Sequence, residues 1–166
     1  MRRLIFVLLV SVAVAPVAPV EAVTLDGFRS VADVAKSPRS IGQLIIPRLG
    51  VNTNIYVGIT DREFDRGVGK WPGTPSAGQV GNLVIGGHRT KGARPFYNIE
   101  KLRRGDIITV VEGQKRARYA VEKQLIVSPT AMWITNQSSK SILTLFSCHP
   151  KGSTKKRYLI RATLVK

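Results

Sequence analysis

The sequence predicts an all-β protein, built as one antiparallel barrel or sandwich. Short runs rich in β-branched and aromatic residues recur at close spacing, glycine and proline separate them, and little room is left for helices. Of the 166 residues, about 140 remain after an apolar leader, which is enough for one domain with its own core and too few for two.

The predicted strands follow one another from residue 41 to the C-terminal end. The first two, GQLIIPRLGV and NTNIYVGI, are separated by Pro47, which marks a bulge, an edge or a break. The third, NLVIGGH, is entered through WPGTPSAGQVG, whose glycines and prolines exclude regular structure. GDIITVVEG and RARYAVEKQLIV follow, and SILTLFSC and RYLIRATLV close the chain. Seven or so such strands predict the fold class.

The N-terminal segment, residues 1–22, has the pattern of an export signal. Two arginines precede an apolar run, which ends in small residues near Ala22. The run is near the short limit for crossing a membrane, so the sequence leaves a cleaved signal peptide and a membrane anchor both open. A buried apolar helix is the alternative. We expect a polar linker or first helix over 23–39 and a single domain over 40–166, outside the cytoplasm.

The net charge of the chain limits the classes of partner that we expect it to bind. Lysine and arginine number 26 against 10 aspartates and glutamates, a formal net charge of +16. The basic residues are scattered, with no RNA-binding signature and no helix that carries a basic stripe, so we expect no nucleic-acid partner. For an exported chain, an anionic cell envelope is the expected partner. No acidic cluster suggests a calcium site, so we expect no metal and no cofactor.

Cys148 is the only cysteine, so the chain cannot form an internal disulfide. In an exported protein, an unpaired thiol is either a small buried hydrophobe or a group whose chemistry is used. A cysteine nucleophile needs a partner that moves protons and a group that stabilises the oxyanion. The candidates are His88 and His149 for the first role, and Arg157 and Arg161 for the second.

Three motifs resemble those of the sortases, cysteine transpeptidases of the bacterial surface. TLFSC, residues 144–148, resembles the TLxTC signature, with Ser147 in place of the usual threonine. VIGGHRT resembles the strand that leads to the catalytic histidine, and Arg157 in KKRYLIRATL matches the arginine of the last strand. The CHP triplet at Cys148 is most like class E. The resemblance covers roughly residues 41–166.

The resemblance implies an eight-stranded β-barrel with short helices in its loops. It also implies a transpeptidation reaction. Cys148 would attack a sorting signal of the LPxTG or LAxTG type between threonine and glycine, forming a thioester. His88 would be the general acid and then the base, and Arg157 would stabilise the oxyanion. The implied partners are surface proteins with a C-terminal sorting signal, and an amine acceptor such as a peptidoglycan precursor or a pilin.

Substrate contacts are less constrained by the sequence. The motif residues Thr144 and Ser147, together with Trp133 from the preceding loop, are the candidates for substrate binding. In that loop Met132, Trp133 and Ile134 are equally consistent with contacts to a leucine side chain and with ordinary core. An L,D-transpeptidase and a basic, non-catalytic wall-binding protein are the alternatives for the whole chain.

Strand geometry selects among the candidate partners of the thiol. If the strand persists through Cys148, His149 points to the opposite face, which favours His88. If the last two strands form an antiparallel hairpin, Arg157 lies beside Cys148. Arg161 is then about 13 Å further along the strand at roughly 3.3 Å per residue. We therefore expect Arg157, not Arg161, to serve the reaction.

Overall fold

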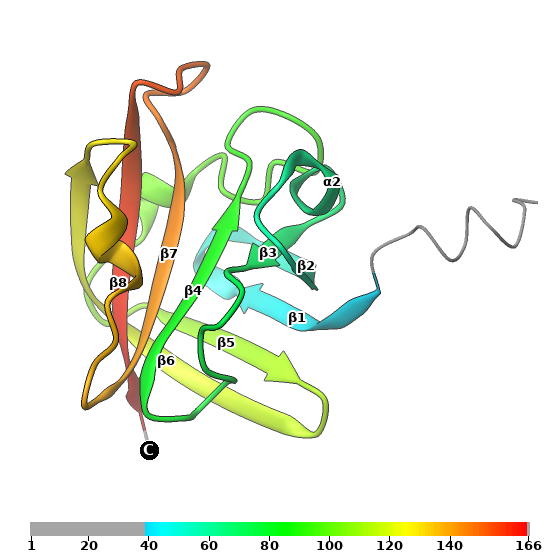
Figure 1. Cartoon of the computed structure of the whole chain (residues 1–166), viewed down its shortest axis with the longest axis vertical. Coiled ribbons are helices and arrows are strands. Elements are labelled where there is room, and N and C mark those ends of the chain that lie inside the picture. Colours follow the sequence, from blue (N-terminus) through cyan, green and yellow to red (C-terminus); the bar gives the residue numbers. More distant parts are fainter. Residues whose placement is uncertain (1–38, 166) are drawn as a thin grey trace, which may run out of the picture.

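The computed structural model describes residues 39–165 (Figure 1). The predicted export segment 1–22 and residues 23–38 of the predicted linker lie outside the described residues. The elements are β1 (Ser40–Ile46), η1 (Pro47–Leu49), β2 (Val51–Val57), α2 (Asp61–Phe64), β3 (Val68–Lys70), β4 (Gly81–Gly87), η2 (Ile99–Lys101), β5 (Ile107–Glu112), β6 (Lys115–Val127), η3 (Met132–Thr135), β7 (Ser141–His149) and β8 (Lys156–Val165). Within residues 39–165, no helix is long and apolar enough to span a membrane.

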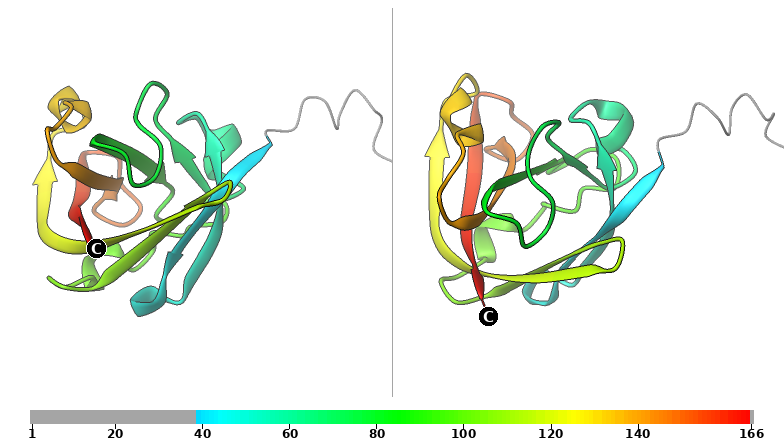
Figure 2. Two further views of the ribbon diagram at one scale, coloured as in Figure 1. Left: turned by 90° about the horizontal axis from the view of Figure 1, so that it is seen from below. Right: turned by 60° about the horizontal axis from the view of Figure 1, so that its bottom comes forward.

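The strands close into one eight-stranded barrel in the order β1-β2-β3-β4-β7-β8-β6-β5. The predicted class, an all-β barrel with short helices in its loops, is therefore confirmed. Figure 2 shows the strands curving around a common interior. The barrel is not wholly antiparallel, however, because β3 runs parallel to β2 and β7 runs parallel to β4. Parallel neighbours need long crossovers, and a sequence pattern that marks strands does not reveal which distant strands pair.

Two details of the first three strands also differ from the strands that the sequence predicts. The Pro47 break is a 3-10 turn, and Gly50 after it has a φ of +65°, a left-handed conformation that suits glycine. β3 has only three residues and lies just before the WPG segment. A strand this short carries too little periodicity to be found from the sequence.

Apolar side chains fill the interior of the barrel and also cover part of its outside. The interior cluster draws on all eight strands, and β4 is buried along its whole length. A second cluster of Val84, Ile134, Phe146 and Leu159 lies under η3. The face of β8 that carries Arg157 and Arg161 therefore includes a fully buried residue, Leu159. The outer face of the barrel that this second cluster covers lies between η3 and α2, and the candidate site is located there.

Candidate active site

A cavity of about 610 Å³ lies at the end of the barrel where β4 and β7 finish and β8 begins. Its walls come from α2, from residues 128–134 with η3, and from the loop that joins β7 to β8. Cys148, His88 and Arg157 all line it. The three residues that the sequence predicts to be catalytic thus share one cavity, although they come from three different strand ends.

The pairing of β7 with β8 brings the thiol and the arginine together. The two strands are antiparallel neighbours, and Cys148 is the direct cross-strand partner of Arg157. Arg161 lies four positions further along and is paired with Thr144. This is the register that the sequence predicts for a hairpin. Cys148 is unpaired and half-buried, so its sulfur is accessible from the cavity.

The parallel pairing of β4 with β7 brings in the histidine from the other side. The register of the two strands ends with Gly86 paired to Phe146, and His88 and Cys148 each follow two residues after that last pair. The hydroxyl of Ser147 donates a hydrogen bond of 2.7 Å to the carbonyl of Gly87, which extends this register by a side chain. Cys148 therefore lies between the strand end that leads to His88 and the strand start that carries Arg157.

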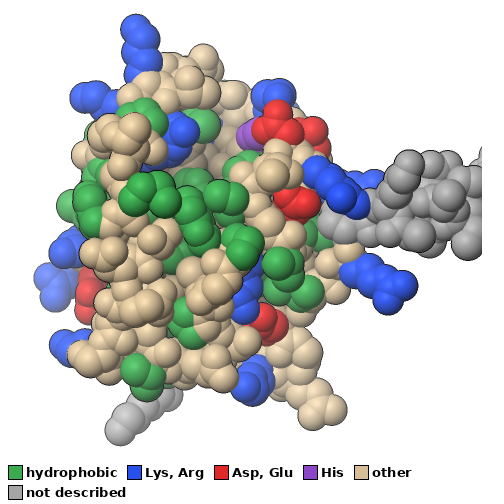
Figure 3. All heavy atoms as spheres, in the orientation of Figure 1, with side chains coloured by type: hydrophobic (Ala, Val, Ile, Leu, Met, Phe, Trp, Pro, Cys, Tyr) green, Lys and Arg blue, Asp and Glu red, His purple; other side chains and the backbone are tan. Residues whose placement is uncertain are grey.

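The imidazole of His88 faces two carboxylates on and beside α2. Its Nε2 atom is 3.4 Å from Asp61 Oδ1 and 3.2 Å from Asp65 Oδ1, which are ion-pair distances when the ring is protonated. The ring edge packs against Phe64, with 5.4 Å between the ring centroids. Figure 3 shows acidic side chains (red) next to a histidine (purple) on this face of the molecule. The ring is therefore packed on Phe64 with its Nε2 atom directed at the two carboxylates.

Local sequence explains why α2 begins at Asp61. Thr60 and Glu63 form a capping box, in which the buried Glu63 carboxylate accepts bonds from the Thr60 amide at 3.1 Å and its hydroxyl at 2.6 Å. Asp61 is the first residue of the helix. A hydrogen bond and the positive charge of Lys91, 3.1 Å away, lower the pKa of Asp61 below its ordinary value. This carboxylate is therefore charged beside His88.

The guanidinium of Arg157 is held at the mouth of the cavity by backbone. Its Nη1 atom donates to the carbonyl of Thr154 at 2.8 Å and to that of Lys156 at 3.1 Å. Arginine carries five N–H donors, so this tether leaves others for an oxygen in the cavity. Arg161 instead lies over the ring of Trp133, 5.8 Å from its centroid, and does not line the cavity.

Aromatic side chains make the inner part of the cavity apolar. The rings of Phe64 and Trp71 pack against Phe146 with centroids 6.3 and 5.9 Å apart. They approach β4 closely at Gly86, where a Cβ atom would lie 2.3 Å from the Phe146 ring. Glycine is therefore required there. A surface of this kind accepts an apolar side chain of a bound peptide.

The three residues expected to bind substrate are placed differently from one another. Ser147 lines the cavity, but its hydroxyl is committed to Gly87. Thr144 is fully buried and donates to Asn82 Oδ1 at 2.7 Å, so it does not reach the cavity. Trp133 is exposed and points outside, whereas its neighbours Met132 and Ile134 line the cavity. Of the three, only Ser147 therefore lines the cavity.

Asn82 links Thr144 to η3, which forms part of the cavity wall. Its side-chain amide donates to the carbonyls of Ile134 at 2.7 Å and Asn136 at 3.0 Å, which tethers η3 to β4. Thr144 occupies the remaining acceptor of the same amide. The sequence contains no local sign of this link, because its members are more than 50 residues apart.

Sequence reasoning missed Asp61, Asp65 and Arg89, which surround the predicted site residues. The acidic pair lies in TDREFD, an ordinary capped helix start, and only the fold brings it to His88. Arg89 follows His88 directly, yet it is buried and reaches His149 and the carbonyl of Cys148. A basic residue beside a candidate catalytic histidine was the one available signal.

Comparison with known proteins identifies the family. The model of the Sortase domain matches residues 44–165. Sortase D of Bacillus subtilis is 28% identical over 147 residues, covering 81% of this chain and 73% of that protein. Sortase SrtE1 of Streptomyces coelicolor is 32% identical over 146 residues, covering 74% of this chain but only 39% of that protein.

Solved structures agree with this result. The sortase D5 transpeptidase of Clostridium perfringens superposes with a TM-score of 0.70 at 27% identity, over 81% of this chain and 86% of that one. The chain is therefore similar in sequence to proteins named sortase D and sortase SrtE1, and in fold to the sortase D5 transpeptidase.

Proposed function

The chain belongs to the sortase family of cysteine transpeptidases, and from that premise we propose that it cuts an LPxTG-type or LAxTG-type sorting signal between threonine and glycine. The threonine carbonyl is then joined to an amine. The family membership sets aside an L,D-transpeptidase and a non-catalytic wall-binding protein. The observation that carries the proposal is the convergence of Cys148, His88 and Arg157 on one cavity.

The first half of the proposed reaction makes a thioester. The Cys148 thiolate attacks the threonine carbonyl carbon, and the carbonyl oxygen becomes an oxyanion. Arg157, directly across from Cys148, donates hydrogen bonds to that oxygen. The carbon–nitrogen bond then breaks, and protonated His88 gives its proton to the leaving glycine amine.

The second half returns the enzyme to its starting state. The acceptor amine attacks the thioester carbon, neutral His88 takes a proton from its nitrogen, and the carbon–sulfur bond breaks to release the thiolate. The new amide joins the sorted protein to the acceptor. We propose a peptidoglycan precursor or a pilin as the source of that amine. Water in place of the amine gives hydrolysis.

The cavity supports a proposal for the position of the substrate, and the charge supports one for the cellular setting. The apolar surface at Trp71, Phe146 and Ile134 suits the leucine of the signal. The CHP triplet at Cys148 favours class E, and with it an LAxTG preference. The net charge of +16 favours a site of action at the anionic envelope, on the extracytoplasmic face of the membrane or in secreted form.

Mass spectrometry of a peptide reaction tests the proposal. The purified protein is incubated with peptides of the form LxxTG and an amine, and the expected product is the amine joined to the threonine carbonyl. Parallel LPxTG and LAxTG peptides measure the preference, and Cys148→Ala is the matched control. A folded wild-type protein with a reactive thiol that cleaves none of these peptides would refute the proposal.

A further inference from the structure

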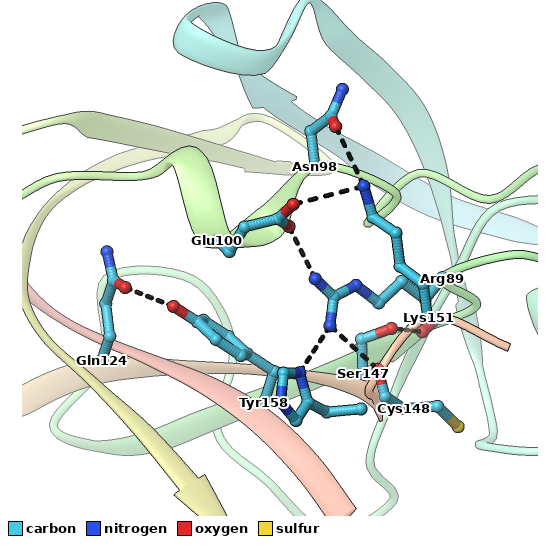
Figure 4. Close-up of polar contacts among 10 residues, drawn as sticks. Arg89, Asn98, Glu100, Gln124, Ser147, Cys148, Lys151 and Tyr158 are labelled. Carbon is cyan, nitrogen blue, oxygen red and sulfur yellow. Dashed lines mark hydrogen bonds and ion pairs between the residues drawn. The ribbon is translucent and has the colours of Figure 1, made fainter. Parts of the chain in front are cut away.

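Arg89 is a buried cation directly behind the nucleophile. Only 4% of its side chain is exposed. Its Nη1 atom donates to His149 Nδ1 at 2.8 Å and to the carbonyl of Cys148 at 3.4 Å. Its Nη2 atom donates to Glu100 Oε2 at 2.7 Å. Figure 4 shows the guanidinium between Glu100 and the end of β7, with the sulfur of Cys148 directed away from it.

A guanidinium stays charged in proteins, so its burial is costly unless it is paired. Glu100 supplies the partner and is itself held by Lys151, 3.2 Å away. Burial raises the pKa of Glu100, but hydrogen bonds from its own backbone, Lys151 and Arg89 outweigh this and lower the pKa below its ordinary value. The Tyr158 ring lies 5.4 Å from the guanidinium carbon and adds a cation–π contact. Both terminal nitrogens of Arg89 are thus engaged within the protein, and only its buried Nε atom has no hydrogen-bond partner among the described residues.

The contact to His149 gives that ring a role at the end of β7. Arginine only donates hydrogen bonds, so in this contact Arg89 is the donor and His149 Nδ1 is the acceptor. The ring packs on Tyr158 with centroids 5.5 Å apart. A packed ring that accepts a bond from a buried cation supports the end of β7.

Backbone pairing explains why the end of β7 needs such a support. On the β8 side the ladder continues to His149 and Lys156, but on the β4 side the register ends at Gly86 and Phe146. The backbone at Cys148 therefore has strand neighbours on one side only. The hydroxyl of Ser147 and the guanidinium of Arg89 provide the side-chain bonds on the other side.

We propose that Arg89 is a positioning residue, which fixes the backbone of Cys148 through its carbonyl and through the ring of His149. The nucleophile is thereby held in the cavity that His88 also lines, opposite Arg157. This inference deepens the proposed function and rests on it. Displacement of a reacting atom by about 1 Å costs on the order of 100-fold in rate, so loss of this support affects turnover far more than binding.

Arg89→Gln is the test variant, and Arg161→Lys is the matched control for a packed arginine outside the cavity. Three quantities are measured on each: melting temperature, kcat and KM for peptide transfer, and the rate of Cys148 alkylation by iodoacetamide without peptide. For Arg89→Gln we expect kcat to fall about 10-fold to 100-fold with KM changed less than about threefold, and alkylation to slow about fivefold or more. Arg161→Lys should match the wild type in kcat and alkylation.

Variants of His149 separate positioning from simple stabilisation. Asparagine retains an acceptor near the place of Nδ1, whereas phenylalanine retains the ring against Tyr158 and removes the acceptor. We expect His149→Asn to exceed His149→Phe in kcat severalfold, and this difference to vanish in the Arg89→Gln background.

The outcomes are distinguishable. A folded Arg89→Gln protein with wild-type kcat and wild-type alkylation overturns the inference, as does a lower melting temperature with no other change. If the wild type transfers no peptide, the proposed function fails, and the alkylation rates still decide whether Arg89 positions the thiol.

Discussion

Cys148 and Arg157 are direct partners across the antiparallel β7–β8 pair, so the nucleophile and the proposed oxyanion donor begin from adjacent backbone positions. The parallel β4–β7 pair, whose last partners are Gly86 and Phe146, leads His88 into the same cavity from the opposite side of β7. The proposed proton carrier and the proposed oxyanion donor therefore come from strands on opposite sides of the cysteine, which allows each to act without displacing the other.

Replacing the thiol should remove the chemistry and leave the fold. We expect Cys148→Ala to abolish both cleavage and transfer, because the nucleophile is gone, with only a small loss of stability from one missing sulfur atom. Intact-protein mass spectrometry should trap a covalent peptide adduct on the wild type and none on the variant. Turnover by a folded Cys148→Ala protein would end the thiol mechanism.

The two histidines should differ sharply. His88 lines the cavity with Cys148, whereas His149 is engaged by Arg89 and Tyr158. We expect His88→Ala to lose nearly all activity and His149→Ala to keep a substantial part, because only the first removes the proton carrier. Kinetics of peptide transfer at one pH compares them, and the reverse ranking would contradict the assignment.

The two arginines of β8 should differ in the same way. We expect Arg157→Ala to lower kcat by about 100-fold or more, comparable to the loss of one oxyanion donor. Arg157→Lys should also fail, since an ammonium keeps the charge but lacks the fork of donors. Arg161→Ala should have a mild effect, because that side chain packs on Trp133 outside the cavity. Equal losses in two folded alanine variants would show that register does not choose the donor.

Thr144 should matter for stability and for the cavity wall rather than for contact with substrate. Thr144→Val keeps the shape but leaves the buried Asn82 Oδ1 atom without its donor, at a cost of about 1–3 kcal/mol in the free energy of unfolding. Since Asn82 tethers η3, KM should rise as well. Thr163→Val, on the partly exposed end of β8, is the control for urea denaturation. Equal stability of the two variants would exclude the proposed tether.

The carboxylate of Glu112 should make stability depend on pH. Its oxygens bind Lys70 Nζ at 2.7 Å and the Ala77 amide at 2.8 Å. Burial raises the pKa of Glu112, but these bonds outweigh it and lower the pKa below its ordinary value of 4.5. A lowered folded-state pKa means that the stabilisation is present above 4.5 and lost as the pH falls through the folded value.

Glu112→Gln is therefore expected to be less stable than the wild type near neutral pH, and the difference in free energy of unfolding should close as the pH falls below 4.5 and through the folded-state pKa. Urea denaturation at several pH values measures it, with the exposed Glu122→Gln as control. A difference in stability that stays constant with pH would show that the glutamine side chain itself, and not the lost charge of Glu112, causes it.

Much of this protein was determined by sequence alone, because the relevant rules act over short distances. Alternating apolar residues and glycine or proline breaks marked most strands, and two strands joined by a short connection form a hairpin, which set Arg157 beside Cys148. The same alternation separated Cys148 from His149. Motif residues then sufficed to select His88, since only two histidines were available.

Tertiary structure alone decided the rest, because it depends on contacts between distant segments. The parallel pairing of β4 with β7 requires a crossover through β5, β6 and η3, and no local pattern records it. That pairing leads His88 into the cavity that Cys148 also lines. Long-range packing likewise brings Asp61 and Asp65 to His88, ties Thr144 to η3, and buries Arg89 behind Cys148. The sequence gives the chemical type of each side chain, but closure of the barrel decides which distant side chain it contacts.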